Sequence, residues 1–127
     1  MGKMSKEKGK AGEREFAKLL RDQGFEARRG QQFAGGGDSP DVVHNIPGFH
    51  FEVKRTERLN LWSAFEQAME DKKDFEVPIV AHRPNRRQWI AVMDMQDLLY
   101  LIRELRQRDL ASTVRREIDG DDGYEDD

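Results

Sequence analysis

Cysteine is absent from this chain of 127 residues. Its absence excludes disulfide bonds, zinc sites built on thiolates and catalysis by a thiol, and it suits a reducing compartment. Long apolar runs are missing as well, since no stretch reaches the roughly 18 residues of a membrane span. The basic start, MGKMSKEKGK, is followed by no apolar signal-peptide region. We therefore predict a cytoplasmic protein with no membrane partner.

Histidine is scarce, and the histidines that occur, His44, His50 and His82, lack the spacing of paired metal ligands. We predict turn or surface positions for them. The glycine run at 35–37 lacks the Lys-Ser/Thr of a phosphate-binding loop and opens no helix. Nucleotide binding is therefore not supported.

Negative charge gathers at the end of the chain. Residues 117–127 hold seven of the 25 acidic residues and none of the 22 basic ones, so residues 1–116 carry a net charge of +4. A cationic body is compatible with nucleic acid. One domain usually takes about 100–150 residues. We therefore divide the chain into a flexible basic N-terminus at 1–9, one domain at 10–110 and a charged, acidic tail at 111–127.

Apolar periodicity and turn residues predict the element order α-β-β-β-α-β-β-α. The predicted helices cover 10–23, 60–74 and 94–108. The predicted strands cover 25–29, 41–44, 50–54, 77–81 and 88–92. The helix between the third and fourth strands is long enough for a crossover connection. An α/β fold with a mixed sheet flanked by helices follows.

Several large apolar side chains are predicted to lie in the core. They are Trp62, Phe65, Trp89 and the helical stripe Leu98, Leu101, Ile102 and Leu105. A surplus apolar face among them is available for a dimer.

Two of the predicted strands carry carboxylates and a lysine among core-type residues. The first begins at Asp41, and the second holds Glu52 and Lys54, which point the same way because side chains alternate along a strand. An antiparallel hairpin turned at the NIPG sequence brings Asp41 alongside Glu52. Converging carboxylates hold a hard divalent cation. Such a cation beside a lysine suits phosphodiester cleavage, in which charge builds up on the phosphoryl oxygens.

The same residues carry a family resemblance. Pro40-Asp41 followed by Glu52-Val53-Lys54 resembles the PD-(D/E)XK nuclease motif, and the element order resembles the restriction-endonuclease-like core of that superfamily. The segment GEREF at 12–16, with GF at 24–25 and Arg29 shortly after, is similar to the opening of archaeal-type and phage Holliday junction resolvases. The similarity runs from about residue 10 to 54, and more loosely to 108.

This resemblance implies a Mg²⁺-dependent endodeoxyribonuclease, with Mn²⁺ able to substitute, that cleaves four-way (Holliday) junctions as a homodimer in a bacterial, archaeal or phage-infected cell. It implies that the catalytic residues are Glu13, Asp41, Glu52 and Lys54. It implies that the metal ligands are Glu13, Asp41, Glu52 and the backbone carbonyl of Val53. A basic residue on the first strand, here Arg29, is implied to touch DNA.

The residues by themselves leave some of these roles open. At 100° per residue, Glu13 lies near the apolar face of the first helix and Glu15 lies towards solvent, which favours Glu13 as the ligand. The alternative is that both are ordinary surface carboxylates. Gln67, early in the crossover helix, is more simply an exposed glutamine than a residue of the metal site.

The predicted DNA contacts extend to a second loop. Arg83, Arg86 and Arg87 lie on a hairpin between the last two strands, where phosphate contact is plausible and a merely soluble loop is the alternative. Two opposed cuts in a junction require two sites, which a two-fold dimer supplies. The competing functions are a nuclease for other branched or linear DNA, an inactive DNA-binding module of the same fold, and a protein-interaction adaptor.

Overall fold

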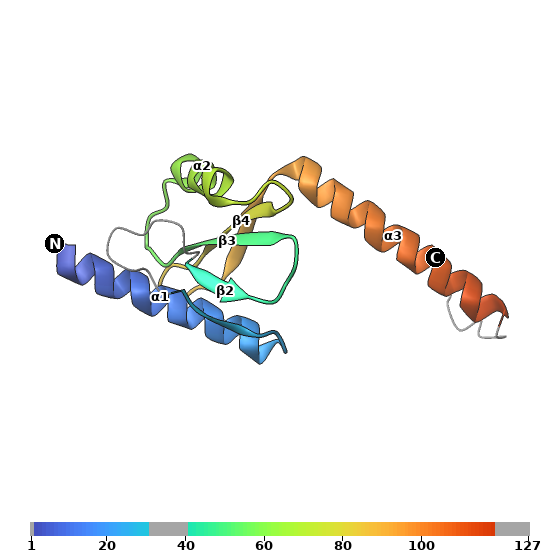
Figure 1. Ribbon diagram of the computed structural model, residues 1–127, viewed down its shortest axis with the longest axis horizontal. Coiled ribbons are helices and arrows are strands. Elements are labelled where there is room, and N and C mark those ends of the chain that lie inside the picture. The colour runs from blue at the N-terminus through green and yellow to red at the C-terminus, as the bar shows by residue number, and fades with distance from the viewer. Residues whose placement is uncertain (1, 31–40, 119–127) are drawn as a thin grey trace. The chain divides into compact units, whose positions relative to one another are not determined.

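The protein, seen here in a computed structural model, is described over residues 2–30 and 41–118. Its elements are α1 Gly2–Asp22, β1 Ala27–Arg29, β2 Val42–His44, β3 Phe49–Lys54, α2 Leu61–Asp71, β4 Val77–His82, β5 Ile90–Met93 and α3 Met95–Ile118 (Figure 1). The predicted order is confirmed. The chain divides into two compact units, 1–94 and 95–127, with α3 in the second. The glycine-rich segment at 31–40, which includes Pro40, and the acidic residues 119–127 lie outside the described residues.

Helix α1 begins at Gly2 rather than at residue 10, so residues 2–9, predicted to be a flexible N-terminus, belong to the helix. Lysine, glutamate and methionine are good helix formers, and an ion pair between Glu7 and Lys10 adds support one turn apart. The helix ends as predicted near Gly24, whose positive φ of 95° a glycine adopts without strain. The N–H of Gly24 bonds to the carbonyl of Arg21, and the N–H of Phe25 to that of Leu20. These two bonds form a Schellman motif.

A mixed sheet forms the centre of the first unit. Strands β3 and β4 are parallel, with Glu52 beside Val80, and β5 is antiparallel to β4. Helix α2 supplies the crossover that a parallel pair requires. The α/β prediction of a mixed sheet flanked by helices is therefore confirmed.

The predicted antiparallel hairpin between β2 and β3 is wrong. Strand β2 pairs with β1 instead, in a separate two-stranded sheet with Val43 opposite Arg28. Two hydrogen bonds also hold the turn after β2 against the residue that precedes β1. The N–H of Asn45 donates to the carbonyl of Glu26, and the side-chain oxygen of Asn45 accepts from the N–H of Glu26. Strand β2 therefore makes its backbone ladder hydrogen bonds with β1 and not with β3.

Two hydrophobic clusters cover opposite faces of the mixed sheet. Neighbouring residues Val80 and Ala81 of β4 point to opposite sides. Ala81 belongs to the cluster with Phe16 of α1, whereas Val80 packs with Phe65 of α2. Each face is thus covered by one helix, as Figure 1 shows for α1 and α2.

The core prediction is confirmed for Phe65, which is 7% exposed. Trp89 is partly buried, and its ring lies 5.1 Å from that of Phe16. The prediction is wrong for Trp62, which is 67% exposed. A helix of this length presents one stripe to a sheet, and in α2 Ala64, Phe65 and Ala68 form that stripe.

Helix α3 makes up the whole described part of the second unit and extends past its predicted end to Ile118. Its apolar stripe was predicted to lie in the core, but Leu98, Ile102 and Leu105 are 36%, 47% and 59% exposed. Periodicity shows which residues share a helix face; it does not show what covers that face. None of the helices in the described ranges is long and apolar enough to cross a membrane.

Candidate active site

Helix α1 brings Glu13 to the end of β3 through a close approach at Gly12. A Cβ at Gly12 would lie 2.5 Å from the Cβ of Arg55, directly after β3, so only glycine allows this crossing. Glu13 is consequently half-buried, which raises the pKa of its carboxyl group. Arg29 opposes that shift, because its Nε donates to Glu13 Oε1 over 2.9 Å.

Asp41 lies one residue before β2 and joins the same cluster of charges. Burial, followed by the charges of Glu52 and Glu13, raises the pKa of Asp41 from 3.8 to about 6. The ammonium group of Lys54 and a hydrogen bond from the backbone N–H of Val53 act in the opposite direction. Asp41 therefore lies beside Glu52, as predicted, even though their strands do not pair.

Strand alternation places His50, Glu52 and Lys54 on one face of β3, the face towards α2. Glu52 is 6% exposed. Its Oε2 lies 3.5 Å from Lys54 Nζ, and its Oε1 lies 3.8 Å from His50 Nε2. The four residues predicted to be catalytic therefore gather at one end of the mixed sheet. Three carboxylates with one lysine form a donor set suited to a hard divalent cation.

The arginines predicted to contact DNA fall into two groups. Arg29 pairs with Glu13, and Arg83 pairs with Glu15, so both guanidinium groups already have carboxylate partners. Arg86 and Arg87 are exposed in the loop between β4 and β5.

Glu15 was predicted to lie towards solvent, but it is a structural anchor. In addition to Arg83, it accepts a hydrogen bond of 3.2 Å from Nε of Arg55. This network ties α1 to the ends of β3 and β4.

Comparison with protein families identifies the chain. The model of the archaeal Holliday junction resolvase family (Hjc) matches residues 4–109. The chain belongs to this family. It is therefore an endonuclease of the PD-(D/E)XK superfamily, a metal-dependent Holliday junction resolvase that selects DNA by structure. Comparisons with curated proteins and with solved structures gave no match.

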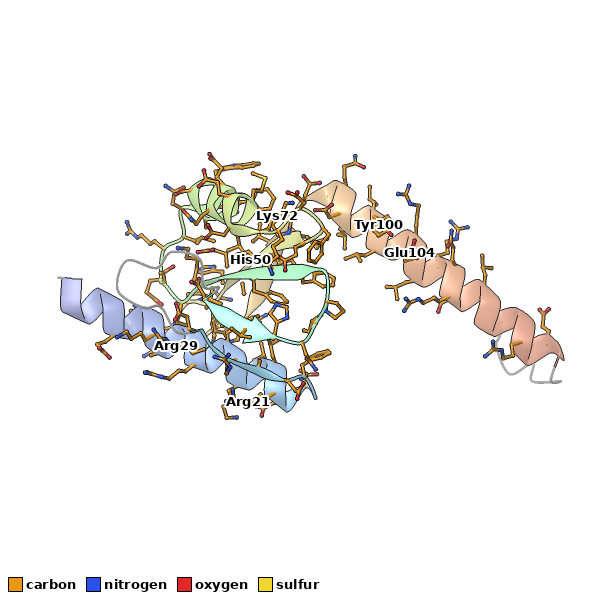
Figure 2. All side chains as sticks on the ribbon, in the orientation of Figure 1. Arg21, Arg29, His50, Lys72, Tyr100 and Glu104 are labelled. Atoms are coloured by element: carbon orange, nitrogen blue, oxygen red, sulfur yellow. The ribbon has the colours of Figure 1, made fainter. Side chains whose placement is uncertain are left out.

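Sequence reasoning missed three residues of this resolvase that border the same region, namely His50, His82 and Asp71. His50 and His82 were predicted at turns or the surface, but they are 7% and 8% exposed on β3 and β4. Figure 2 shows His50 on the α2 side of β3. Asp71, at the end of α2, lies near His50 and Glu52. The available signal was the position of His50, two residues before Glu52 and therefore on the same face of the strand.

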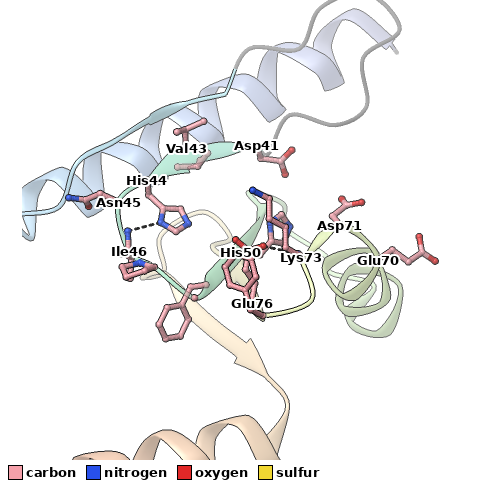
Figure 3. Close-up of a pocket in the computed structure, with 15 residues that line it drawn as sticks. Asp41, Val43, His44, Asn45, Ile46, His50, Glu70, Asp71, Lys73 and Glu76 are labelled. Atoms are coloured by element: carbon pink, nitrogen blue, oxygen red, sulfur yellow. Dashed lines mark hydrogen bonds between the residues drawn. The ribbon is translucent and has the colours of Figure 1, made fainter.

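A pocket of about 650 Å³ lies beside the predicted site. Its lining includes Asp41, His50 and Asp71, which come from three different elements or their ends (Figure 3). Glu52 raises the pKa of His50, against the effect of burial. Gln67 is exposed, as predicted, and its amide donates to Asp71 Oδ2 over 3.0 Å.

Proposed function

We propose that this resolvase hydrolyses phosphodiester bonds of four-way DNA junctions with Mg²⁺ held by Glu13, Asp41, Glu52 and the carbonyl of Val53, and that Mn²⁺ can substitute. The observation that carries the proposal is the mutual repulsion of three carboxylates at one end of the sheet. The charges of Glu52 and Glu13 contribute to the raised pKa of Asp41. A divalent cation offsets this repulsion, whereas without one the arrangement is costly.

The side chains around the site have separate tasks in this proposal. A bound cation polarises a phosphoryl oxygen and lowers the pKa of water. Lys54, placed 3.5 Å from Glu52 Oε2, directs the attacking water or stabilises the charge that builds up on the phosphate. Arg29 holds the carboxylate of Glu13 in place from the side, which makes it a positioning residue.

Contacts to DNA are assigned first to the loop between β4 and β5. Arg86 and Arg87 are exposed there, so they are free to reach phosphates without breaking a buried ion pair. Arg29 and Arg83 reach DNA only at the cost of weakening their pairs with Glu13 and Glu15. Contact by these two arginines remains a prediction.

We further propose that the protein acts as a homodimer through the exposed stripe of α3. Leu98, Ile102 and Leu105 recur four and three residues apart, the spacing of one helix face. Leu105→Glu should therefore shift the solution mass from about twice 14.8 kDa to 14.8 kDa. Gln107→Glu, on the opposite face, is the control and should leave the dimer intact.

A cleavage assay tests the proposed site and substrate together. The substrates are a synthetic four-way junction and a duplex of matched sequence, each with Mg²⁺ or with EDTA. We expect cleavage of the junction, with Mg²⁺ only, and a loss of at least about 100-fold in Asp41→Asn and Glu52→Gln. Junction affinity in EDTA should change little. Glu66→Gln, an exposed carboxylate on α2, serves as the control.

Two results would contradict these assignments. Undiminished cleavage by folded Asp41→Asn would refute the site. Equal cleavage of duplex and junction by a monomer would refute the junction preference and the dimer, and would favour a nuclease for other branched or linear DNA.

A further inference from the structure

His50 is a buried side chain whose ring nitrogen has no satisfactory partner. The side chain is 8% exposed, and Nε2 makes no hydrogen bond to any of the described residues. The carboxylate oxygen Oε1 of Glu52 lies 3.8 Å from this nitrogen, which is longer than a hydrogen bond. Buried polar atoms are normally satisfied, so this nitrogen needs an explanation.

Asp71 completes a group of three possible ligands with His50 and Glu52. One ligand atom from each of these residues lies within 4.8 Å of the others. The amide of Gln67, one turn earlier on α2, holds Oδ2 of Asp71 and leaves Oδ1 available. Support of this kind is typical of carboxylates that bind metal ions.

The spacing of these atoms favours a metal ion over a simple ion pair. A protonated imidazole and a carboxylate approach to about 2.7–2.9 Å. Ligand bonds of about 2.0–2.2 Å instead place two ligand atoms about 3–4 Å apart around an ion. The separation of 3.8 Å between His50 Nε2 and Glu52 Oε1 matches the spacing of two ligand atoms around a metal ion.

The residue types also indicate which ion is bound. Imidazole suits divalent transition metals, whereas Mg²⁺ prefers oxygen ligands and retains its waters. We propose that His50, Glu52 and Asp71 form a second divalent-cation site that favours a transition metal such as Mn²⁺ over Mg²⁺. Glu52 is shared with the site proposed above, and only this sharing rests on the proposed function.

A pair of cations on either side of Glu52 would explain why its two oxygens face different groups. Oε2 faces Lys54 and Oε1 faces His50. Paired ions stabilise both the attacking and the leaving oxygen of a phosphoryl group. The second site therefore adds to the chemistry of the first rather than replacing it.

Mn²⁺ titration of the full-length, metal-free chain tests this inference. Electron paramagnetic resonance counts the bound ions, and pulsed measurements detect magnetic coupling to an imidazole nitrogen. We expect two Mn²⁺ per chain with nitrogen coupling in the wild type. Asp71→Asn should bind one ion. His50→Gln should lose the nitrogen coupling. Asp74→Asn, an exposed neighbour outside the group, is the control and should bind two.

The variants separate this inference from the proposed catalytic site. Asp41→Asn should retain the nitrogen-coupled ion and lose the other, and Mg²⁺ in excess should displace only the ion that Asp41 helps to hold. Wild-type binding without nitrogen coupling, or an unchanged ion count in Asp71→Asn, would overturn the second site and leave the first intact. Retention of both ions in Asp41→Asn would overturn the first site and leave the second. Asp71 is exposed, so Asp71→Asn tests the proposal even if His50→Gln fails to fold.

Discussion

Asp41→Asn should stabilise the metal-free protein while it removes activity. Burial and the neighbouring carboxylates raise the pKa of Asp41 from 3.8 to about 6, so the fold accommodates the neutral carboxyl group better than the charged one. Asparagine keeps an oxygen that can accept the N–H of Val53 but carries no charge. At neutral pH, the substitution therefore relieves a repulsion that a bound cation would offset.

The size of this effect follows from the pKa shift. One pKa unit corresponds to about 1.4 kcal/mol, so the shift from 3.8 to about 6 corresponds to ~3 kcal/mol. Because the pKa is raised, the contribution of Asp41 to stability is fully present below 3.8 and is lost as the pH rises through about 6. The variant should therefore gain ~1 kcal/mol at pH 4.5 and ~3 kcal/mol at pH 7.5.

Urea denaturation in EDTA at the two pH values measures this difference in the free energy of unfolding. Adding Mg²⁺ at pH 7.5 should stabilise the wild type but not the variant, so the difference between their free energies of unfolding should become smaller. Glu66→Gln, an exposed carboxylate, should change little at either pH. The reasoning is refuted if Asp41→Asn is less stable than the wild type at pH 7.5, or if the difference does not depend on pH.

Four other changes test the packing and the charges. Gly12→Ala should destabilise the fold by about 1–3 kcal/mol because the added methyl group overpacks the crossing of α1 and β3. Gly9→Ala, which meets open space, should stabilise the helix by about 0.5–1 kcal/mol, and urea denaturation measures the free energy of unfolding of both glycine variants. Arg29→Gln should lower the free energy of unfolding by about 1–3 kcal/mol in urea denaturation, since it leaves the half-buried Glu13 without its arginine partner. Unchanged stability would contradict this prediction. Deletion of 117–127 should tighten DNA binding at low salt but not at high salt, because seven carboxylates compete with phosphates. Equal DNA affinity of the full-length and truncated proteins at low salt would contradict this prediction.

Local patterns in the sequence were sufficient for much of the fold. The order of helices and strands follows from apolar periodicity and from turn residues such as Gly24, both of which act over a few neighbouring residues. The parallel pairing of β3 with β4 follows from the length of the helix between them. The acidic residues and the lysine were also found from the sequence, because Glu52 and Lys54 share a strand face and resemble a known nuclease motif.

Only the tertiary structure decided which distant groups meet. Strand β2 pairs with β1 rather than with β3, and no local pattern distinguishes these partners. Whether an apolar stripe is covered depends on the rest of the chain, so the sequence did not predict the exposure of Leu105. The approach of Asp71 to His50 joins the end of a helix to a strand. Such contacts depend on how elements pack across the sheet, and residue spacing along the chain carries no record of that geometry.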